Sequence, residues 1–288
     1  IKNRTFYIQV LEKDTKKPVI EKKLVVNKDE WKEFSVCLSK LGEGIFTVKI
    51  YSKENVKVKK GKKYISQIQN KYHFERRYFV FNSDSKQNSF PFKTPNINSV
   101  IYKPEKIVVE ELDNPRGIVP IGCKQVSKVY KFFPDDIPVK DKITFIINAD
   151  AKEKNTEQLA LFTLRHGRYI FIGDQKNRFP EISGRFNYLS EILILRDLNP
   201  PFISDELKYS EDEDEFRFTV KDNATGTDYE TMKITVNDET VEFDWDPDTG
   251  EIFIDFNKFT KEGDYTFKAI IKDRAGNILN YKKKISFN

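Results

Sequence analysis

Apolar and polar side chains alternate one by one along most of this 288-residue chain. The alternation is clear in five segments: Phe6-Tyr-Ile-Gln-Val10, Phe46-Thr-Val-Lys-Ile50, Phe216-Arg-Phe-Thr-Val220, Val241-Glu-Phe-Asp-Trp245 and Ile252-Phe-Ile-Asp-Phe256. A strand points successive side chains to opposite faces, so a period of two predicts strands with one dry face and one wet face. We therefore expect an all-β protein.

Short turn signals separate the alternating segments. They contain Gly, Asp, Asn or Pro, and examples are Leu41-Gly-Glu-Gly44, Asp246-Pro-Asp-Thr-Gly250, Glu262-Gly-Asp264 and Ala275-Gly-Asn277. Strands joined by short turns at this spacing are typical of β-sandwiches. No long segment has the apolar repeat of an amphipathic helix, and Lys152 to Leu164 is the best candidate for a short helix.

The length allows two or three domains, since domains usually have about 100–150 residues. Two stretches have the composition of junctions: the polar, proline-marked residues 82–99, predicted to be a linker or surface connection, and Asn199-Pro-Pro201. We predict tandem immunoglobulin-like or fibronectin-like β-sandwich domains. Their expected bounds are 1–93 for a basic domain, 94–198 for a middle β-domain, and 199–288 for an acidic domain.

Charge is distributed unevenly along the chain. The net charge is +12 for residues 1–93, +2 for residues 94–198 and −9 for residues 199–288, within a total of +5. Such asymmetry indicates either a basic end that faces an anionic partner or two ends that attract each other or neighbouring chains. The simpler alternative is three independently solvated surfaces.

Composition excludes two classes of protein. Aromatic residues make up 14% of the chain, which supplies large side chains for a core and argues against a disordered polypeptide. The longest apolar runs, such as Ile143 to Ile147, are far shorter than the roughly 18 residues of a membrane span. The chain begins at Ile1 without Met. We expect a processed or excised form, with a signal peptide or an upstream domain before Ile1.

Two cysteines do not form a disulfide framework. Cys37 lies in a strand-like apolar stretch, Phe34-Ser-Val-Cys-Leu38, and is expected to be a small buried side chain. Cys123 follows Gly122 in an expected loop. Whether the two cysteines pair stays open at this point.

A basic segment near the N-terminus is the strongest positive signal for binding. Basic side chains alternate there with Tyr64, Tyr72, Phe74 and Tyr78. The candidate contacts to an anion or partner are Lys57, Lys59, Lys60, Lys62, Lys63, Arg76 and Arg77. Lysines and arginines interleaved with aromatic rings can hold single-stranded nucleic acid, or an anionic cell-wall or membrane polymer. The alternative is a charged hairpin whose aromatic side chains pack into the first domain.

Residues typical of catalytic sites are scarce. His73 and His166 have no second ligand or orienting partner at a motif spacing, and both read as ordinary surface or strand histidines. The acidic stretches Glu211–Glu215 and Asp244–Gly250 lack the spacing of a calcium loop and read as a solvated edge and a hairpin turn. We therefore predict no catalytic residue, no metal ligand and no cofactor. An enzyme whose site is assembled only in space remains the third alternative.

The last 90 residues carry a recognisable order of segments. Pro200-Pro201 is followed by Phe216-Arg-Phe-Thr-Val-Lys-Asp-Asn223, Met232-Lys-Ile-Thr-Val-Asn-Asp238 and Lys272-Asp-Arg-Ala-Gly-Asn277. This order resembles the terminal immunoglobulin-like domain of bacterial envelope proteins, in particular the domain that follows the catalytic unit of lysostaphin-like zinc endopeptidases. Four earlier segments resemble the middle β-domain of the same proteins: Ser127-Lys-Val-Tyr-Lys-Phe-Phe133, Ile137-Pro-Val139, Ile143-Thr-Phe-Ile-Ile147 and Gly173 to Pro201. The resemblance thus covers about residues 120–288.

The resemblance implies a role in the bacterial cell wall but not its chemistry. Those peptidases bind zinc through H-x(3)-D and H-x-H motifs, and this chain has neither. We therefore expect a non-catalytic accessory or positioning module of a cell-wall peptidase-like protein, located in the periplasm or cell envelope. Its expected partner is a cell-wall polymer or an envelope protein. The alternative is an anion- or nucleic-acid-binding protein that uses the basic N-terminal domain.

Overall fold

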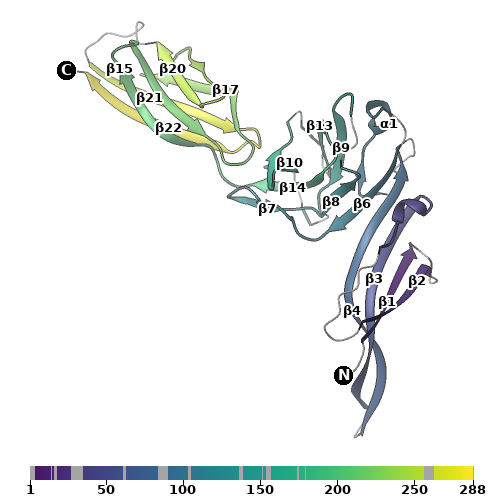
Figure 1. The fold of residues 1–288 in the computed structure, drawn as a ribbon. Coiled ribbons are helices and arrows are strands. Elements are labelled where there is room, and N and C mark those ends of the chain that lie inside the picture. The colour runs from purple at the N-terminus through teal and green to yellow at the C-terminus, as the bar shows by residue number, and fades with distance from the viewer. Residues whose placement is uncertain are drawn as a thin grey trace. The chain divides into compact units, whose positions relative to one another are not determined.

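The structure is a computed structural model of the chain. It describes residues 4–13, 15, 18–26, 35–60, 63–83, 90–102, 105–135, 139–150, 152–153, 157–173, 175–178, 180–255 and 263–287. The chain is nearly all β, with several separate antiparallel sheets (Figure 1). This confirms the predicted all-β, sandwich-type fold. In the described part of the chain, no helix is long and apolar enough to span a membrane.

The chain divides into two compact units that interleave along the sequence. Unit 1 comprises residues 1–115, 128–146 and 185–192, and unit 2 comprises residues 116–127, 147–184 and 193–288. The domains expected from the sequence are consecutive stretches instead, and their boundaries stay predictions.

Unit 1 is built mainly from strands of one antiparallel ladder. Its elements are β1 (Arg4–Glu12), β2 (Pro18–Val26), η1 (Leu38–Lys40), β3 (Gly44–Lys60), β4 (Lys63–Asn82), β5 (Phe92–Lys93), α1 (Ile97–Val100), β6 (Lys106–Leu112), β8 (Val129–Phe133) and the start of β9 (Ile143–Asn148). The ladder has the order β8-β6-β4-β3-β1-β2. Figure 1 shows β3 and β4 as a long hairpin, whose register runs from Gly44 opposite Val80 to Lys60 opposite Lys63.

The alternating pattern accounts for the core of this ladder. Val10 lies opposite Val48, and both are buried together with Phe46 and Val80. The side chains between them on each strand point to the other face, as a period of two requires. The predicted one-sided burial is therefore confirmed for β1 and β3.

Residues 90–99 contribute to the core of unit 1, so the expected linker or surface connection is wrong for these residues, whereas residues 84–89 of the same prediction lie outside the described part of the chain. Phe92 is 1% exposed, and its ring lies 5.2 Å from those of Phe79 and Tyr130 and 5.3 Å from that of Phe132. Ile97 is also buried, at the start of α1. The polar composition of the segment predicts a surface position, but a few large apolar side chains suffice to anchor a segment in a core.

Unit 2 contains the remaining strands. They are β7 (Cys123–Gln125), β10 (Leu159–Arg165), β11 (Arg168–Phe171), β12 (Lys176–Arg178), most of β13 (Glu181–Phe186) and of β14 (Glu191–Asp197), β15 (Phe202–Ser210), β16 (Glu215–Lys221), β17 (Thr227–Val236), β18 (Glu239–Thr240), β19 (Asp244–Trp245), β20 (Glu251–Asp255), β21 (Gly263–Asp273) and β22 (Ile278–Phe287).

The last 90 residues form a sandwich of two four-stranded sheets with the orders β15-β16-β20-β19 and β18-β17-β21-β22. Its core takes alternate residues from each strand, for example Phe216, Phe218 and Val220 from β16. The rings of Phe216 and Phe267, one from each sheet, meet edge to face at 4.5 Å. Two sheets that bury their inner faces against each other are the arrangement that the alternating sequence predicts.

The short helix expected at Lys152 to Leu164 is absent from the described residues of that stretch, so this prediction is wrong. Leu159 begins β10 instead, and its residues up to Thr163 are all buried. Ile192 to Leu195 of β14, the neighbour of β10, are also consecutive buried residues. A strand that is covered on both faces loses its alternation, and a short apolar run then cannot be told from a helix by periodicity.

Candidate functional site

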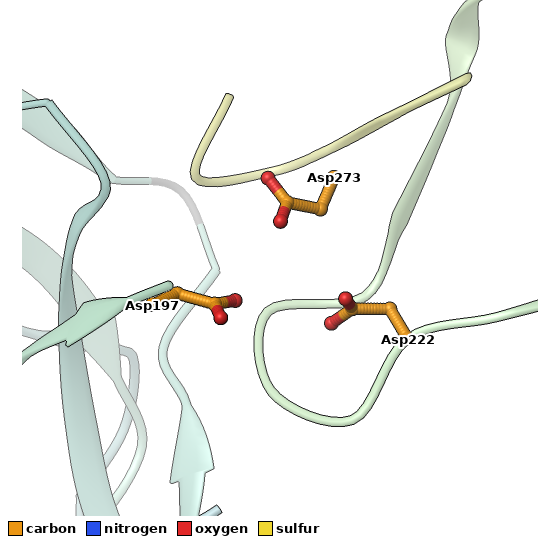
Figure 2. Close-up of side chains that lie close together, drawn as sticks. All are labelled: Asp197, Asp222 and Asp273. Carbon is orange, nitrogen blue, oxygen red and sulfur yellow. The ribbon is translucent and has the colours of Figure 1, made fainter. Parts of the chain in front are cut away.

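Three aspartates from distant parts of unit 2 meet at the ends of its strands. Asp197 ends β14, Asp222 directly follows β16, and Asp273 ends β21. One carboxylate oxygen of each lies within 4.8 Å of the others. Figure 2 shows the three carboxylates pointing toward one another. We call this group the carboxylate cluster.

The carboxylate cluster is largely removed from solvent. Asp197 is 0% exposed and Asp273 is 2% exposed, while Asp222 is half-buried. Buried charged groups in proteins are normally paired with an opposite charge or coordinate a metal ion. None of the ion pairs found among the described residues involves any of the three carboxylates. The cluster therefore concentrates like charge without a cationic partner in the described part of the chain.

Local turns hold two of the carboxylates in place. Asp222 Oδ1 accepts hydrogen bonds from the backbone amides of Ala224, at 2.9 Å, and Gly226, at 2.7 Å. Asp273 Oδ1 accepts from the amides of Ala275, at 2.9 Å, and Asn277, at 2.8 Å. Aspartate commonly begins such turns, because its short side chain reaches the backbone two to four residues ahead. The sequence of each turn thus orients its own carboxylate.

Asp197 is held by segments on both sides of the double proline. Its Oδ1 accepts from the Asn199 amide at 3.2 Å, and its Oδ2 accepts from Thr225 Oγ1 at 3.0 Å. Its backbone carbonyl accepts from Asn277 Nδ2 at 3.2 Å. Asn277 in turn accepts a 2.5 Å hydrogen bond at Oδ1 from Gln158 Nε2. These contacts fix the position of Asp197 relative to the loops that carry the other two carboxylates.

The electrostatics of the cluster disfavour full ionisation. Burial raises the pKa of Asp197 to about 6, and the negative charges of Asp222 and Asp273 add to the effect, while hydrogen bonds from Asn199 and Thr225 oppose it. Burial also raises the pKa of Asp273, against the hydrogen bonds from Asn277. A cation or a proton placed among the carboxylates would relieve this repulsion.

The donor set suits a hard divalent cation. Calcium takes oxygen ligands at about 2.3–2.6 Å, so two oxygens on one ion are separated by at most about 5 Å. The spacing of the cluster meets this limit. Carboxylate oxygens are preferred by Ca²⁺ and Mg²⁺ over the softer metals that cysteine and histidine bind. The three aspartates could therefore supply part of the coordination shell of such an ion.

Cys123 lies near the cluster and is a poor nucleophile. Burial raises the pKa of its thiol to about 12, and the negative charges of Asp197, Asp222 and Asp273 contribute. Cys123 begins β7, although the sequence suggested a loop. Because the thiolate is the reactive form of cysteine, this site does not provide an activated thiol.

The expectation that Cys37 is buried on a strand is wrong. Cys37 is exposed and precedes η1, and its Sγ lies 3.2 Å from Ser39 Oγ. Val36 and Leu38 pack against the core of unit 1, so the residue between them points away from it. The hydrogen bond with Ser39 lowers the pKa of Cys37. Both cysteines are free thiols.

The two thiols are expected to differ in their rates of alkylation by iodoacetamide at pH 8, with Cys37 faster by a factor on the order of 30 or more. The pKa of Cys123 is raised from the ordinary value of 9.0 to about 12, which lowers its thiolate fraction at pH 8 about 1000-fold relative to an ordinary cysteine, whereas the pKa of Cys37 is lowered. The greater intrinsic nucleophilicity of the Cys123 thiolate recovers only part of that loss. The rate at Cys123 should keep rising through pH 9, since its pKa is about 12. Peptide mass spectrometry measures both rates, and the unfolded chain is the control. Equal rates in the folded protein would contradict the burial of Cys123.

The predicted basic contacts that the structure describes lie on the β3–β4 hairpin. Lys57, Lys59 and Lys60 belong to β3 and Lys63 begins β4, whereas Lys62 lies outside the described residues. Their role in binding an anion stays a prediction.

The two arginines among the predicted contacts form ion pairs within unit 1. Arg76 Nη1 lies 3.4 Å from Asp113, and its Nε lies 3.9 Å from Glu110. Arg77 Nη1 lies 3.4 Å from Glu111. Acidic side chains of β6 and the loop after it thus match part of the positive charge of β4. Contact of these arginines with an anionic partner also stays a prediction.

The histidines and the two acidic stretches considered in the sequence analysis do not belong to the carboxylate cluster. His166 is exposed in the turn between β10 and β11, and His73 lies on β4. Glu211 to Asp214 form the turn between β15 and β16, and Glu215 begins β16. Glu213 in this turn pairs with Arg217 at 3.0 Å. Asp246–Gly250 forms the turn between β19 and β20, which confirms the hairpin interpretation.

Sequence reasoning missed the carboxylate cluster and predicted no metal ligand. A signal was present, since each aspartate ends the same short pattern: an apolar residue, a basic residue and Asp, in Leu195-Arg-Asp197, Val220-Lys-Asp222 and Ile271-Lys-Asp273. Each pattern marks a strand end that leads into a polar turn. The comparisons with known proteins add no name to this arrangement: no protein-family model matches the chain, and no curated protein matches it significantly.

Proposed function

We propose that this chain is a non-catalytic module of the bacterial cell envelope. It serves as the accessory β-domains of a cell-wall peptidase-like protein and positions that protein through contact with cell wall or an envelope protein. The observation that carries the proposal is the network of hydrogen bonds that ties together the segments on either side of Asn199-Pro-Pro201.

The backbone at this junction is restricted, and hydrogen bonds link the segments on its two sides. Two prolines limit the backbone between β14 and β15. Thr225 and Asn277, which follow β16 and β21, donate to Asp197 before the prolines. A tandem β-protein whose successive sandwiches are joined by loose loops could not hold a partner at a set distance, because a flexible linker samples many separations.

The backbone of Gly122 and the side chain of Asn199 also pack closely at this junction. Gly122 has φ +84°, and a Cβ placed there would lie 1.9 Å from Asn199 Nδ2. The same amide donates to the carbonyl of Ile121 at 3.4 Å. Glycine is needed at this position both for the left-handed backbone and for the space that Asn199 occupies. The junction thus depends on residues before β7, after β14 and inside the last 90 residues.

The resemblance of residues 120–288 to the β-domains of lysostaphin-like peptidases supports the envelope location. The absence of both zinc motifs from the sequence supports a non-catalytic role.

Co-sedimentation with purified cell-wall sacculi tests the proposal. We expect the chain to sediment with sacculi at moderate salt and to release no soluble wall fragments, with or without added zinc. Release of fragments would contradict the non-catalytic role. Failure to sediment at every salt concentration, together with failure to capture envelope proteins, would contradict the positioning role.

The salt dependence separates this proposal from binding through the basic hairpin. Contacts between lysines or arginines and phosphates weaken by about one logarithmic unit per contact for each decade of salt. Binding to single-stranded DNA that falls this steeply, without binding to sacculi, would favour the anion-binding alternative.

A further inference from the structure

A surface groove in unit 2 adjoins the carboxylate cluster. Its volume is about 890 Å³, which lies within the range of roughly 300–1,000 Å³ typical of ligand sites. The groove is lined mainly by polar side chains from the loops that follow β16 and β19 and from the start of β17, and Trp245 forms part of its wall.

Two stacked aromatic rings, those of Trp245 and Tyr229, lie at this groove. Trp245 is 41% exposed although it is one of the largest apolar side chains of the protein. Its ring is nearly parallel to that of Tyr229, with an interplanar angle of 11° and a centroid distance of 5.9 Å. Phe243 packs against the same indole at 6.2 Å. The indole is thus held in a fixed orientation while part of it faces solvent, as an aromatic binding surface requires.

The β19–β20 turn approaches Tyr229 closely and has special backbone geometry. Gly250 has φ +78°, and a Cβ there would lie 2.3 Å from the carbonyl oxygen of Val220 and 3.3 Å from the Tyr229 hydroxyl. Only glycine allows this close approach of the β19–β20 turn to β16. Gly250 and Tyr229 therefore line the groove side by side.

The groove contains polar groups that have no side-chain hydrogen bond within the described part of the protein. They include the carboxylate of Glu230, the guanidinium of Arg274 and the indole N–H of Trp245, all of which line the groove. A planar carboxylate or guanidinium can bond two neighbouring hydroxyl groups at once. Convergent polar groups beside an exposed aromatic face match the alternating hydroxyl edges and C–H faces of a sugar ring.

The net negative charge of the groove lining disfavours the binding of polyanions. Its ionisable lining side chains are Asp222, Asp228, Glu230, Asp248, Lys221 and Arg274. Four carboxylates against two cations repel phosphate or sulfate polymers, so nucleic acid and teichoic-acid-like polyanions are disfavoured here.

We propose that this groove binds an uncharged glycan chain, with Trp245 and Tyr229 stacking on sugar rings and Glu230 and Arg274 bonding to hydroxyl groups. The inference rests on the proposed function, because it names the glycan strands of the cell wall as the polymer that the module contacts.

Titration calorimetry with a hexamer of N-acetylglucosamine tests the site, and we expect binding that single-stranded DNA of similar length does not show. Trp245→Ala should weaken binding at least about tenfold, as loss of a central aromatic contact commonly does. Trp245→Phe should retain part of the affinity. Phe202→Ala is the matched control, because Phe202 is 40% exposed in the same unit but does not line the groove. Circular dichroism would check that every variant is folded.

The outcomes distinguish the groove from the wider proposal. Unchanged binding to the hexamer in folded Trp245→Ala, or preference for an oligolysine peptide over the hexamer, would overturn the glycan inference. Sedimentation with sacculi that survives in Trp245→Ala would leave the proposed function standing and remove the groove as its contact. Binding to the hexamer without any binding to sacculi would support the groove as a glycan site and contradict the cell-wall role.

Discussion

Calcium is expected to raise the midpoint temperature of thermal unfolding of unit 2 by about 5–10 °C. A ligand at 100 times its dissociation constant stabilises the folded state by about 2.7 kcal/mol, and 1 kcal/mol shifts the midpoint of a domain of 150–250 residues by about 2–4 °C. The physical reason is that three buried or half-buried carboxylates within 4.8 Å lack a cationic partner among the described residues. Differential scanning calorimetry with calcium and with a chelator measures the shift.

Matched variants locate the effect of calcium. Asp197→Asn removes one carboxylate charge from the cluster and should abolish most of the shift. Asp212→Asn removes an exposed carboxylate from the β15–β16 turn and should leave the shift intact. An equal shift in both variants would mean that calcium acts elsewhere on the protein.

The absence of a shift with every divalent cation would mean that protons neutralise the cluster. Asp197 has a folded-state pKa of about 6, above the value near 3.9 of an unfolded aspartate. Its protonated form then stabilises the fold fully below about pH 4, and this contribution is lost as the pH rises through 6. In chelator, unfolding midpoints should fall over this range, and the fall should be smaller in Asp197→Asn.

Replacing Phe92 by Ala is expected to lower the free energy of unfolding of unit 1 by about 3–5 kcal/mol, the usual cost of emptying a buried aromatic site. Phe92 is 1% exposed and contacts the rings of Phe79, Tyr130 and Phe132. Urea denaturation followed by tyrosine fluorescence or circular dichroism measures the loss.

Ile68→Ala is the control for this substitution. Ile68 lies on β4 of the same unit and is 70% exposed, so its truncation should cost less than about 1 kcal/mol. A similarly small loss in Phe92→Ala would show that residues 82–99 behave as the linker that their composition indicates.

Alternation of buried and exposed residues explains why the sequence predicts the strands of the last sandwich. Phe216, Phe218 and Val220 are buried while Arg217 is not, and Ile252 and Ile254 repeat the pattern on the paired strand. When one face of a strand is exposed to solvent, the sequence of that strand alone shows which side chains point into the core. This alternation is absent from β10, whose residues Leu159 to Thr163 are all buried, and from the segment around the buried Phe92. The predictions of a helix at the first and of a surface connection at the second are therefore wrong.

The carboxylate cluster shows the limit of the same reasoning. The pattern of apolar residue, basic residue and aspartate identifies three strand ends, and each turn orients its own carboxylate through local hydrogen bonds. A local pattern does not show that these three strand ends meet. Their meeting depends on how strands far apart in the chain pack together, which involves contacts throughout the fold.

The fold class, the inward face of the half-exposed strands and the positions of most turns depend on neighbouring residues, so they can be predicted from the amino-acid sequence. Three features depend instead on how distant segments pack: the meeting of Asp197, Asp222 and Asp273, the stacking of Trp245 on Tyr229 at a groove, and the exposure of Cys37 between two residues that contact the core. Packing against distant segments decides which side chains are buried, and at the carboxylate cluster this burial is the main cause of the raised pKa of Asp197.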